Sequence, residues 1–319
     1  MAGAWALALD GGGTKTAAAL ASREGEVAIL PEGAGCNPQD GPGWDGVLTD
    51  LLGRAALAGG GLAAAVLGIP GRGEVPRHDE AVDALLLRLL PCPHEAMNDV
   101  ALAHLGAFGG GEGVLLLAGT GSMAWARGPA GEARVGGWGH AFGDEGSAHW
   151  IGRETLMVVS RIIDGRLPPD DAFVGALLTR LGPEAVGGFA PLGWVMAQGP
   201  RSRAAIASLA VHVDALAEDG HAAAIERMSE AADDLSWLAR AAARRAGLPE
   251  PFPWVAAGSV FRSKTLTAGL ADWIGRPVQG RLTTLAGGLQ RAARLAGWDV
   301  GEAWAAQVDA RLRAHVPTP

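Results

Sequence analysis

One arrangement occurs twice in this chain and restricts its folding more than any other feature. Residues 4–9 (AWALAL) form a short apolar run that ends at Asp10 and three glycines, and residues 14–21 are extended again. Residues 113–128 (GVLLLAGTGSMAWARG) repeat the order of apolar run, Gly/Thr turn and second run. Short apolar runs that end at glycine are typical of buried strands entering tight turns. The repeat predicts two domains of related topology that face each other, with a boundary near 109–113.

Length and composition agree with two globular domains. The chain has 319 residues, of which 49% are hydrophobic and 19% charged, so it can bury two cores of moderate size. The net charge of -8 argues against a nucleic-acid surface, because neutralising phosphates requires clustered cations. We therefore expect no nucleic-acid partner.

The cysteines and the N-terminus favour a cytoplasmic protein. Cys36 and Cys92 are too few for a disulfide scaffold and lack zinc-ligand spacing. A reducing compartment fits this usage best. The opening residues have no basic segment and no cleavage site, and Asp10 interrupts the apolar run, so they predict a strand rather than a signal peptide. The longest apolar stretches are too short or too interrupted to span a membrane.

Helical patterns dominate the second half. We predict helices over 146–163, 170–181, 203–218, 222–246 and 285–297 and at the C-terminus, and in the first half over 79–90 and 98–108. Residues 43–67 begin as a helix and end as a strand, and 251–261 form a strand that enters a Gly turn.

The two Gly/Thr turns are candidate phosphate sites. In the first, Asp10 precedes Gly12, Gly13, Thr14 and Lys15, so that backbone N–H groups can approach a phosphate and the carboxylate can hold Mg²⁺. The spacing is not that of a P-loop. A Gly-rich hairpin without a ligand is the alternative.

The second turn contains Thr120 and Gly121, followed by Ser122, and a plain hairpin is again the alternative. Two such turns in one chain favour a shared phosphate-binding site over two unrelated hairpins.

Three further segments carry candidate site residues. Asp99 follows Asn98 at the start of a helix, where it could orient a hydroxyl and accept its proton, or cap the helix. The segment Gly136–Ser147 holds five glycines in twelve residues together with Asp144, which could accept hydrogen bonds from sugar hydroxyls or cap the next helix. Asn37 lies before a proline on a constrained loop, with a plain turn as the alternative.

The last candidate segment is Ala257–Phe261, which contains Gly258 and Ser259. This turn of small residues after a strand could admit a flat adenine ring, with an ordinary strand-to-helix turn as the alternative.

The ordered set of motifs resembles the N-acetylglucosamine kinase group of the actin/hexokinase-like superfamily. That group also includes bacterial glucosamine kinases and the BadF/BcrA-type ATPases. The resemblance runs from Leu7 to about Gly297, and GGWGHAFGDEGSAHWIG is its most specific part. AAGSVFRS and LAGGLQRAARLAG resemble the family's C-terminal motifs.

The resemblance implies an α/β fold of two ribonuclease-H-like (actin/hexokinase-like ATPase) domains with an interdomain cleft. We place the domains at 1–110 and 111–319, with the last helix a candidate to return to the first domain. It also implies ATP and Mg²⁺ as cofactors and a small-molecule sugar as substrate. N-acetyl-D-glucosamine, phosphorylated at its 6-hydroxyl, is the leading substrate, and a homodimer would suit the family.

Site roles also follow from the resemblance, residue by residue. It implies that Asp10 positions Mg²⁺ and that Asp99 is the catalytic base. The implied nucleotide-binding residues are Gly12, Gly13, Thr14, Lys15, Thr120, Gly121, Gly258 and Ser259, and the implied sugar-binding residues are Asn37, Asp99, Ser122 and Asp144.

Three alternatives stay open at this point. The sugar could be glucosamine or another amino sugar, because Met123 stands where some relatives carry a polar residue. The chain could be an activator ATPase of the BadF/BcrA type, although Cys36 and Cys92 lack cluster spacing. It could also be a sugar sensor without activity.

Overall fold

The computed structural model describes residues 4–57, 60–183, 185 and 187–315. By its internal contacts the chain divides into two compact units. Unit 1 comprises the residues up to Gly111 together with those from Gln279 onward, and unit 2 comprises Glu112–Val278. Within the described residues, no helix is both long and apolar enough to cross a membrane.

Unit 1 is built on a six-stranded mixed sheet. Its strands are β1 (Trp5–Gly11), β2 (Lys15–Ser22), β3 (Val27–Ile29), β4 (Gly33–Ala34), β5 (Leu62–Ile69) and β6 (His94–Asn98). The order is β3-β2-β1-β5-β6, with β4 paired to β2. Strands β1, β5 and β6 are parallel, whereas β1 and β2 form an antiparallel hairpin.

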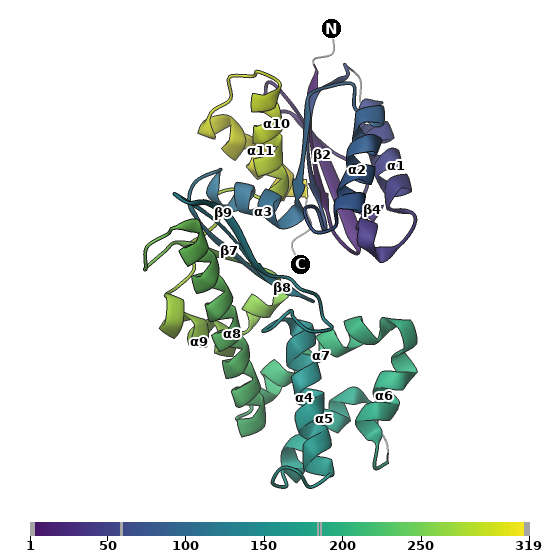
Figure 1. Ribbon diagram of the computed structural model, residues 1–319, viewed down its shortest axis with the longest axis vertical. Helices are drawn as coiled ribbons and strands as arrows, with labels where there is room; N and C mark the ends of the chain where they lie inside the picture. Colours follow the sequence, from purple (N-terminus) through teal and green to yellow (C-terminus); the bar gives the residue numbers. More distant parts are fainter. Residues whose placement is uncertain (1–3, 58–59, 184, 186, 316–319) are drawn as a thin grey trace. The chain divides into compact units, whose positions relative to one another are not determined.

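Helices cover both faces of this sheet (Figure 1). The helices of unit 1 are α1 (Trp44–Ala56), α2 (Pro76–Leu89), α3 (Asp99–Phe108), α10 (Thr284–Leu295) and α11 (Glu302–His315). Side chains alternate across a strand. Accordingly, Leu7 and Leu9 of β1 join a core with α1 and α2, while Ala6 and Ala8 join one with α3, α10 and α11.

Unit 2 combines a smaller sheet with a helical region. Strands β7 (Gly113–Ala118), β8 (Ser122–Gly128), β9 (Gly131–Gly136) and β10 (Trp254–Ala257) lie in the order β10-β7-β8-β9. The helices are α4 (Ala148–Ile163), α5 (Asp171–Leu181), α6 (Ala190–Gln198), α7 (Ser202–Glu218), α8 (Ala222–Ala246) and α9 (Lys264–Ile274). One core joins β7, β8 and β10 with residues of α4, α5, α7, α8 and α9.

The elements with strong periodicity match the sequence predictions, and six weaker ones were missed. The strands on each side of both Gly/Thr turns are present, and α5, α7 and α8 span nearly the predicted residues. The strands and helices that were not predicted are β3, β4, β6, β9, α6 and α9. Strand β6 (HEAMN) has no apolar run, because most of its residues are only half-buried at the side of the sheet.

The division of the chain differs from the expected 111–319 for the second domain. We expected only the last helix as a candidate to return to the first domain. Instead, unit 1 resumes at Gln279 and contains both α10 and α11. The physical reason lies in α10. Its apolar face, with Ala286, Leu289 and Ala293, is buried in the same core as Ala6 and Ala8 of β1.

Two glycines allow α10 to lie very close to α3. A Cβ built on Gly287 would lie 2.5 Å from the Cα and 2.7 Å from the nitrogen of Gly106. A Cβ on Gly106 would in turn lie 2.6 Å from the carbonyl oxygen of Thr283. Both obstacles are backbone atoms, which cannot move aside as a flexible side chain can.

We therefore expect Gly287→Ala to destabilise the protein by about 1–3 kcal/mol, because overpacking a tight contact forces backbone shifts. Gly46→Ala is the matched control, since a Cβ there meets nothing within 4 Å in helix α1. That change should leave stability equal or raise it by about 0.5–1 kcal/mol. Urea unfolding of both variants measures the effect. Equal stability of the two variants would contradict the close approach of α3 and α10.

Candidate functional site

Three parallel strands of unit 1 bring the predicted acidic residues to one edge of the sheet. Asp10, near the end of β1, is paired in register with Gly68 of β5. Ile69 at the end of β5 is paired with Asn98 at the end of β6, and Asp99 follows directly. The carboxyl ends of parallel strands are where ligands bind in open α/β sheets. Asp10 and Asp99 therefore lie at the edge where such a site is expected.

Burial and a neighbouring charge perturb Asp10. Burial, and to a lesser extent the negative charge of Asp99, raise the pKa of its carboxyl to about 7, and Lys15 opposes this shift. The two acidic residues are thus close enough to repel each other. The helix-capping role falls to Asn98, whose Oδ1 accepts a hydrogen bond of 3.0 Å from the Val100 N–H. Asp99 is the first residue of α3 rather than its cap.

The first Gly/Thr turn is packed tightly at its base and exposed at its tip. A Cβ on Gly11 would lie 2.6 Å from the Cys36 sulfur and 2.7 Å from the Gly68 carbonyl oxygen. The Cys36 N–H donates to the Gly12 carbonyl at 3.1 Å. Gly13 and Thr14 are exposed at the tip, so their backbone groups are open to a ligand. Lys15 is also exposed and forms an ion pair with Glu32 at 3.0 Å.

Asn37 lies on the loop that packs against this turn. Its Oδ1 accepts a hydrogen bond of 3.0 Å from the Gln39 N–H, which caps the short 3₁₀-helix Pro38–Asp40. A Cβ on Gly71 would come within 3.3 Å of the same oxygen, so Asn37 lies beside the loop that follows β5. The structure thus places Asn37 in the same unit as Asp10 and Asp99.

The second Gly/Thr turn, in unit 2, leads from β7 into β8. The Gly119 N–H donates to the Gly121 carbonyl at 2.9 Å, and the Ala148 N–H at the start of α4 donates to the Gly119 carbonyl at 2.9 Å. Thr120 is exposed at the tip. The turn and the N-terminus of α4 are therefore held together by this backbone hydrogen bond.

Asp144 and Ser122 support this turn from within. Asp144 is only 4% exposed and has a positive φ of 58°, an unusual conformation for a non-glycine residue. A Cβ on Gly121 would lie 2.8 Å from its Oδ2, and the Arg203 guanidinium lies 3.4 Å from the same oxygen. Burial raises the pKa of Asp144, while Arg203 and backbone hydrogen bonds of Ser122 and Gly139 oppose the shift.

Ser122 is also buried, and its hydroxyl donates to the Glu145 carbonyl at 2.6 Å. We expected Asp144 and Ser122 to contact a sugar. Both side chains are buried and make polar contacts at this turn, and their contact with a sugar stays a prediction.

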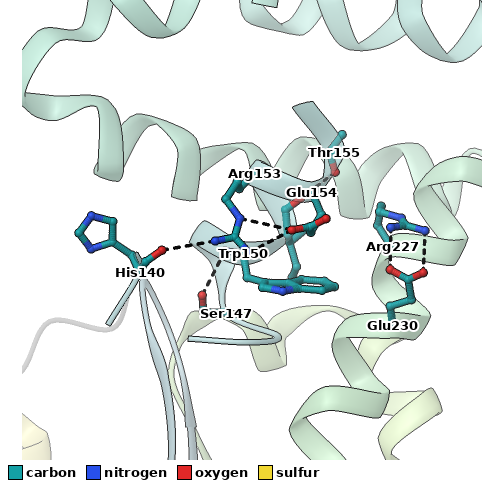
Figure 2. A network of polar contacts seen from close by, with 9 residues as sticks. His140, Ser147, Trp150, Arg153, Glu154, Thr155, Arg227 and Glu230 are labelled. Atoms are coloured by element: carbon teal, nitrogen blue, oxygen red, sulfur yellow. Dashed lines mark hydrogen bonds and ion pairs between the residues drawn. The ribbon is translucent and has the colours of Figure 1, made fainter. Parts of the chain in front are cut away.

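Arg153 of α4 lies next to His140 of the Gly-rich segment that contains Asp144 (Figure 2). Arg153 of α4 donates to the His140 carbonyl at 3.4 Å and forms an ion pair with Glu154 at 3.0 Å. Burial first, and then electrostatic interaction with His140, Arg153 and Arg203, lower the pKa of His149 to about 4. His149 is therefore a neutral, packed residue near pH 7.

A cavity of about 460 Å³ lies in unit 2 next to the second turn, within the size range of ligand sites. Thr120 and Ser259 line it, and so does one face of α7. A Cβ on Gly258, whose φ is 108°, would clash with the Ala118 carbonyl oxygen, so only glycine fits here. The two segments predicted to bind nucleotide, 119–121 and 257–261, are thus neighbours.

Sequence reasoning missed the contribution of α7 to this cavity. The lining residues of this helix are Ala204, Ala207, Ser208, Ala210, Val211 and Asp214. Small residues at helical spacing are more often core than site, which is why they were overlooked. Asp214 on that face was the only signal that could have found it.

The family model for the BadF/BadG/BcrA/BcrD ATPases matches residues 7–285. The chain belongs to this ATPase family. A curated relative, an N-acetylmuramic acid/N-acetylglucosamine kinase of Clostridium acetobutylicum, is 39% identical over 71 residues. That segment covers 22% of this chain and 23% of the relative, so the chain matches less than a quarter of the relative's length.

Solved structures of sugar kinases share the fold. A candidate N-acetylglucosamine kinase of Chromobacterium violaceum has a TM-score of 0.69 at 24% identity, covering 91% of this chain and 99% of its own. One from Porphyromonas gingivalis has a TM-score of 0.65 at 21% identity, with 90% and 98% covered. A ROK hexokinase of Thermus thermophilus has a TM-score of 0.51 at 16% identity, with 98% and 100% covered. The fold of the family member described here is therefore that of the actin/hexokinase-like ATPases, as predicted.

Several acidic side chains of this ATPase-family member gather beneath the Gly-rich segment. Burial first, and then the negative charges of Glu145, Glu230, Asp233 and Glu154, together raise the pKa of Asp234 on α8 to about 6. Figure 2 shows Glu230 paired with Arg227, at 2.6 Å. Arg227 thus balances only part of the negative charge around Asp234.

Asp234→Asn tests this electrostatic arrangement. Because the folded-state pKa of about 6 lies above the ordinary 3.8, the folded protein binds more protons than the unfolded chain between these values. Wild-type stability contributed by this group is therefore lost as pH rises through that window. We expect the free energy of unfolding of the variant to rise relative to that of wild type from about pH 4 to about pH 7. Above pH 7 the difference should stay constant. Urea unfolding across pH measures it, and a difference that does not vary with pH would contradict the raised pKa.

Proposed function

We propose that the protein is an ATP-dependent sugar kinase that phosphorylates an amino sugar, with N-acetyl-D-glucosamine at its 6-hydroxyl as the leading substrate. The observation that carries the proposal is that Asp10 and Asp99 both lie at the carboxyl edge of the parallel strands β1, β5 and β6. Membership of an ATPase family and the segment related to an N-acetylmuramic acid/N-acetylglucosamine kinase support it.

Asp99 is the proposed catalytic base. A sugar hydroxyl is a weak nucleophile, and a carboxylate can align it and accept its proton as the phosphoryl group transfers. Asn98 performs the capping of α3, so Asp99 is not needed for that structural role. Asn37, which lies beside the loop after β5, is the proposed sugar-binding residue in unit 1.

Asp10 is the proposed magnesium ligand. Burial and the negative charge of Asp99 raise its pKa, and a divalent cation bound there would stabilise its ionised form. Among the described residues, no group of three or more His, Cys, Asp or Glu side chains is placed to hold a metal ion. This fits Mg²⁺, which usually takes one or two carboxylates and completes its shell with water and substrate phosphates. Bound there, Mg²⁺ would neutralise charge on the phosphates.

The remaining nucleotide contacts come from the two turns. Gly12, Gly13, Thr14 and Lys15 of unit 1 and Thr120 and Gly121 of unit 2 are proposed to bind phosphates through backbone N–H groups and side-chain donors. Gly258 and Ser259 are proposed to bind the adenosine, since they lie beside the cavity of unit 2. Fixed donors of this kind supply electrostatic stabilisation without reorganisation during transfer.

The test is ADP release from MgATP in the presence of single sugars. We expect N-acetylglucosamine or glucosamine to stimulate release several-fold over the rate without sugar, while glucose stimulates less. ATP hydrolysis at a rate that no sugar changes would favour an activator ATPase instead. Cys36 counts against that alternative, because it is 0% exposed and cannot reach a cluster shared with a second subunit.

Asp99→Asn should lower kcat by about a hundredfold or more, because the amide cannot accept the hydroxyl proton. Binding of ATP should change little. Asp45→Asn, at an exposed site in the first turn of α1, is the control and should keep wild-type turnover. Steady-state kinetics together with calorimetric ATP binding separate the two effects. A variant with near-normal kcat would remove Asp99 from the role of base.

A further inference from the structure

The cavity of unit 2 contains a carboxylate to which no role has yet been given. Asp214 lines the cavity from α7, together with Ser263 from the start of α9. Its Oδ1 accepts a hydrogen bond of 2.5 Å from the Ser263 hydroxyl. The Ser263 oxygen in turn accepts from the Leu266 N–H at 3.1 Å. The carboxylate is therefore held in place by a fixed neighbour rather than left to rotate in solvent.

We propose that Asp214 selects the base of the nucleotide by accepting a hydrogen bond from the 6-amino group of adenine. This inference rests on the proposed function in that it takes the cavity as the nucleotide site. One carboxylate oxygen is used by Ser263, and the other is the acceptor that we assign to the base.

The position of Asp214 along α7 places it at the base end of the cavity. Ala204 and Asp214 both line the cavity and are ten residues apart, which corresponds to about 15 Å along a helix. Ala148, which also lines it, is bonded through its N–H to Gly119 of the second turn. Gly152, one turn later on α4, packs against Ile206. The first part of α7 is therefore near the phosphate turn, and Asp214 is at the other end.

Charge supports the same orientation. A carboxylate close to a triphosphate would repel it, whereas a carboxylate close to the base meets N–H donors. Ile151, Ala207, Met228 and Val260 give the cavity apolar walls, and Ser208 and Arg262 also line it. Such walls suit the faces of a flat purine ring, and a few polar groups at the edge then fix its identity.

Asp214 can accept hydrogen bonds but cannot donate them while it is ionised. Adenine presents an amino donor at position 6, whereas hypoxanthine and guanine present a carbonyl acceptor there. A 6-oxo purine would therefore place two acceptors against each other and leave the carboxylate without its partner. Sites that hydrogen-bond a ligand group reject analogues that lack it far better than apolar sites reject a changed shape.

The first experiment uses the unaltered protein. Dissociation constants for MgATP, MgITP and Mg-2′-deoxy-ATP are measured by calorimetry without sugar. We expect ITP to bind at least tenfold more weakly than ATP, and 2′-deoxy-ATP to bind about as well as ATP. Equal affinity for ATP and ITP would overturn the proposal. A penalty for 2′-deoxy-ATP instead of ITP would assign Asp214 to the ribose and overturn it as well.

The second experiment uses Asp214→Asn, whose amide oxygen can still accept from Ser263 while its NH₂ group faces the cavity. We expect ATP to bind about tenfold more weakly and ITP more tightly, so that the preference for ATP falls or reverses. Glu218→Gln removes a carboxylate from an exposed position one turn further along α7 and should leave the ATP/ITP ratio unchanged. An equal loss of affinity for both nucleotides in Asp214→Asn would mean that Asp214 only joins α7 to α9.

These measurements separate the inference from the proposed kinase activity, because they record binding rather than turnover. A protein that binds ATP with the expected selectivity but phosphorylates no sugar would overturn the proposed function and keep the role of Asp214. A protein that transfers phosphate to a sugar from ATP and ITP with equal kcat/KM would keep the proposed function and overturn the role of Asp214.

Discussion

The constraint on which the site of unit 1 depends is the register of three parallel strands. Strand β5 lies between β1 and β6, and the pairing of Asp10 with Gly68 and of Ile69 with Asn98 fixes where each strand ends. Glycine at position 68 is part of this arrangement, since a Cβ there would lie 2.8 Å from Leu102 and 3.2 Å from the Cα of Asp99. A slip of one residue in either pairing would turn one of the two acidic residues to the other face of the sheet.

Placing Asp10 in a buried position, near the negative charge of Asp99, has an electrostatic cost, which appears as a pKa of about 7 for Asp10. Perturbed carboxylates at the end of a strand are typical of functional sites, because the fold gains nothing from them in the absence of a ligand. The second turn uses a buried charge differently. There burial raises the pKa of Asp144, and Arg203 and backbone hydrogen bonds oppose the shift.

Much of the fold and of the candidate site could be predicted from the sequence, and the features that were missed have physical reasons. The two strand–turn–strand segments were predictable because glycine and apolar residues follow strict local rules. The burial of Asp144 and Ser122 could not be predicted, because it depends on how helices pack over a loop that has no periodic pattern of its own. Asp214 was missed because Ser263, to which it is hydrogen-bonded, is 49 residues away in the chain.

The most direct test of the account is to follow the γ-phosphoryl group itself, by ³¹P NMR of the protein with MgATP and N-acetylglucosamine. ADP release alone cannot distinguish transfer to a sugar from hydrolysis. The account predicts a sugar 6-phosphate resonance that grows as the γ-phosphate signal of ATP declines, with little inorganic phosphate. Inorganic phosphate as the main product, with the sugar unchanged, would contradict the assignment of Asp99 as the base for a sugar hydroxyl.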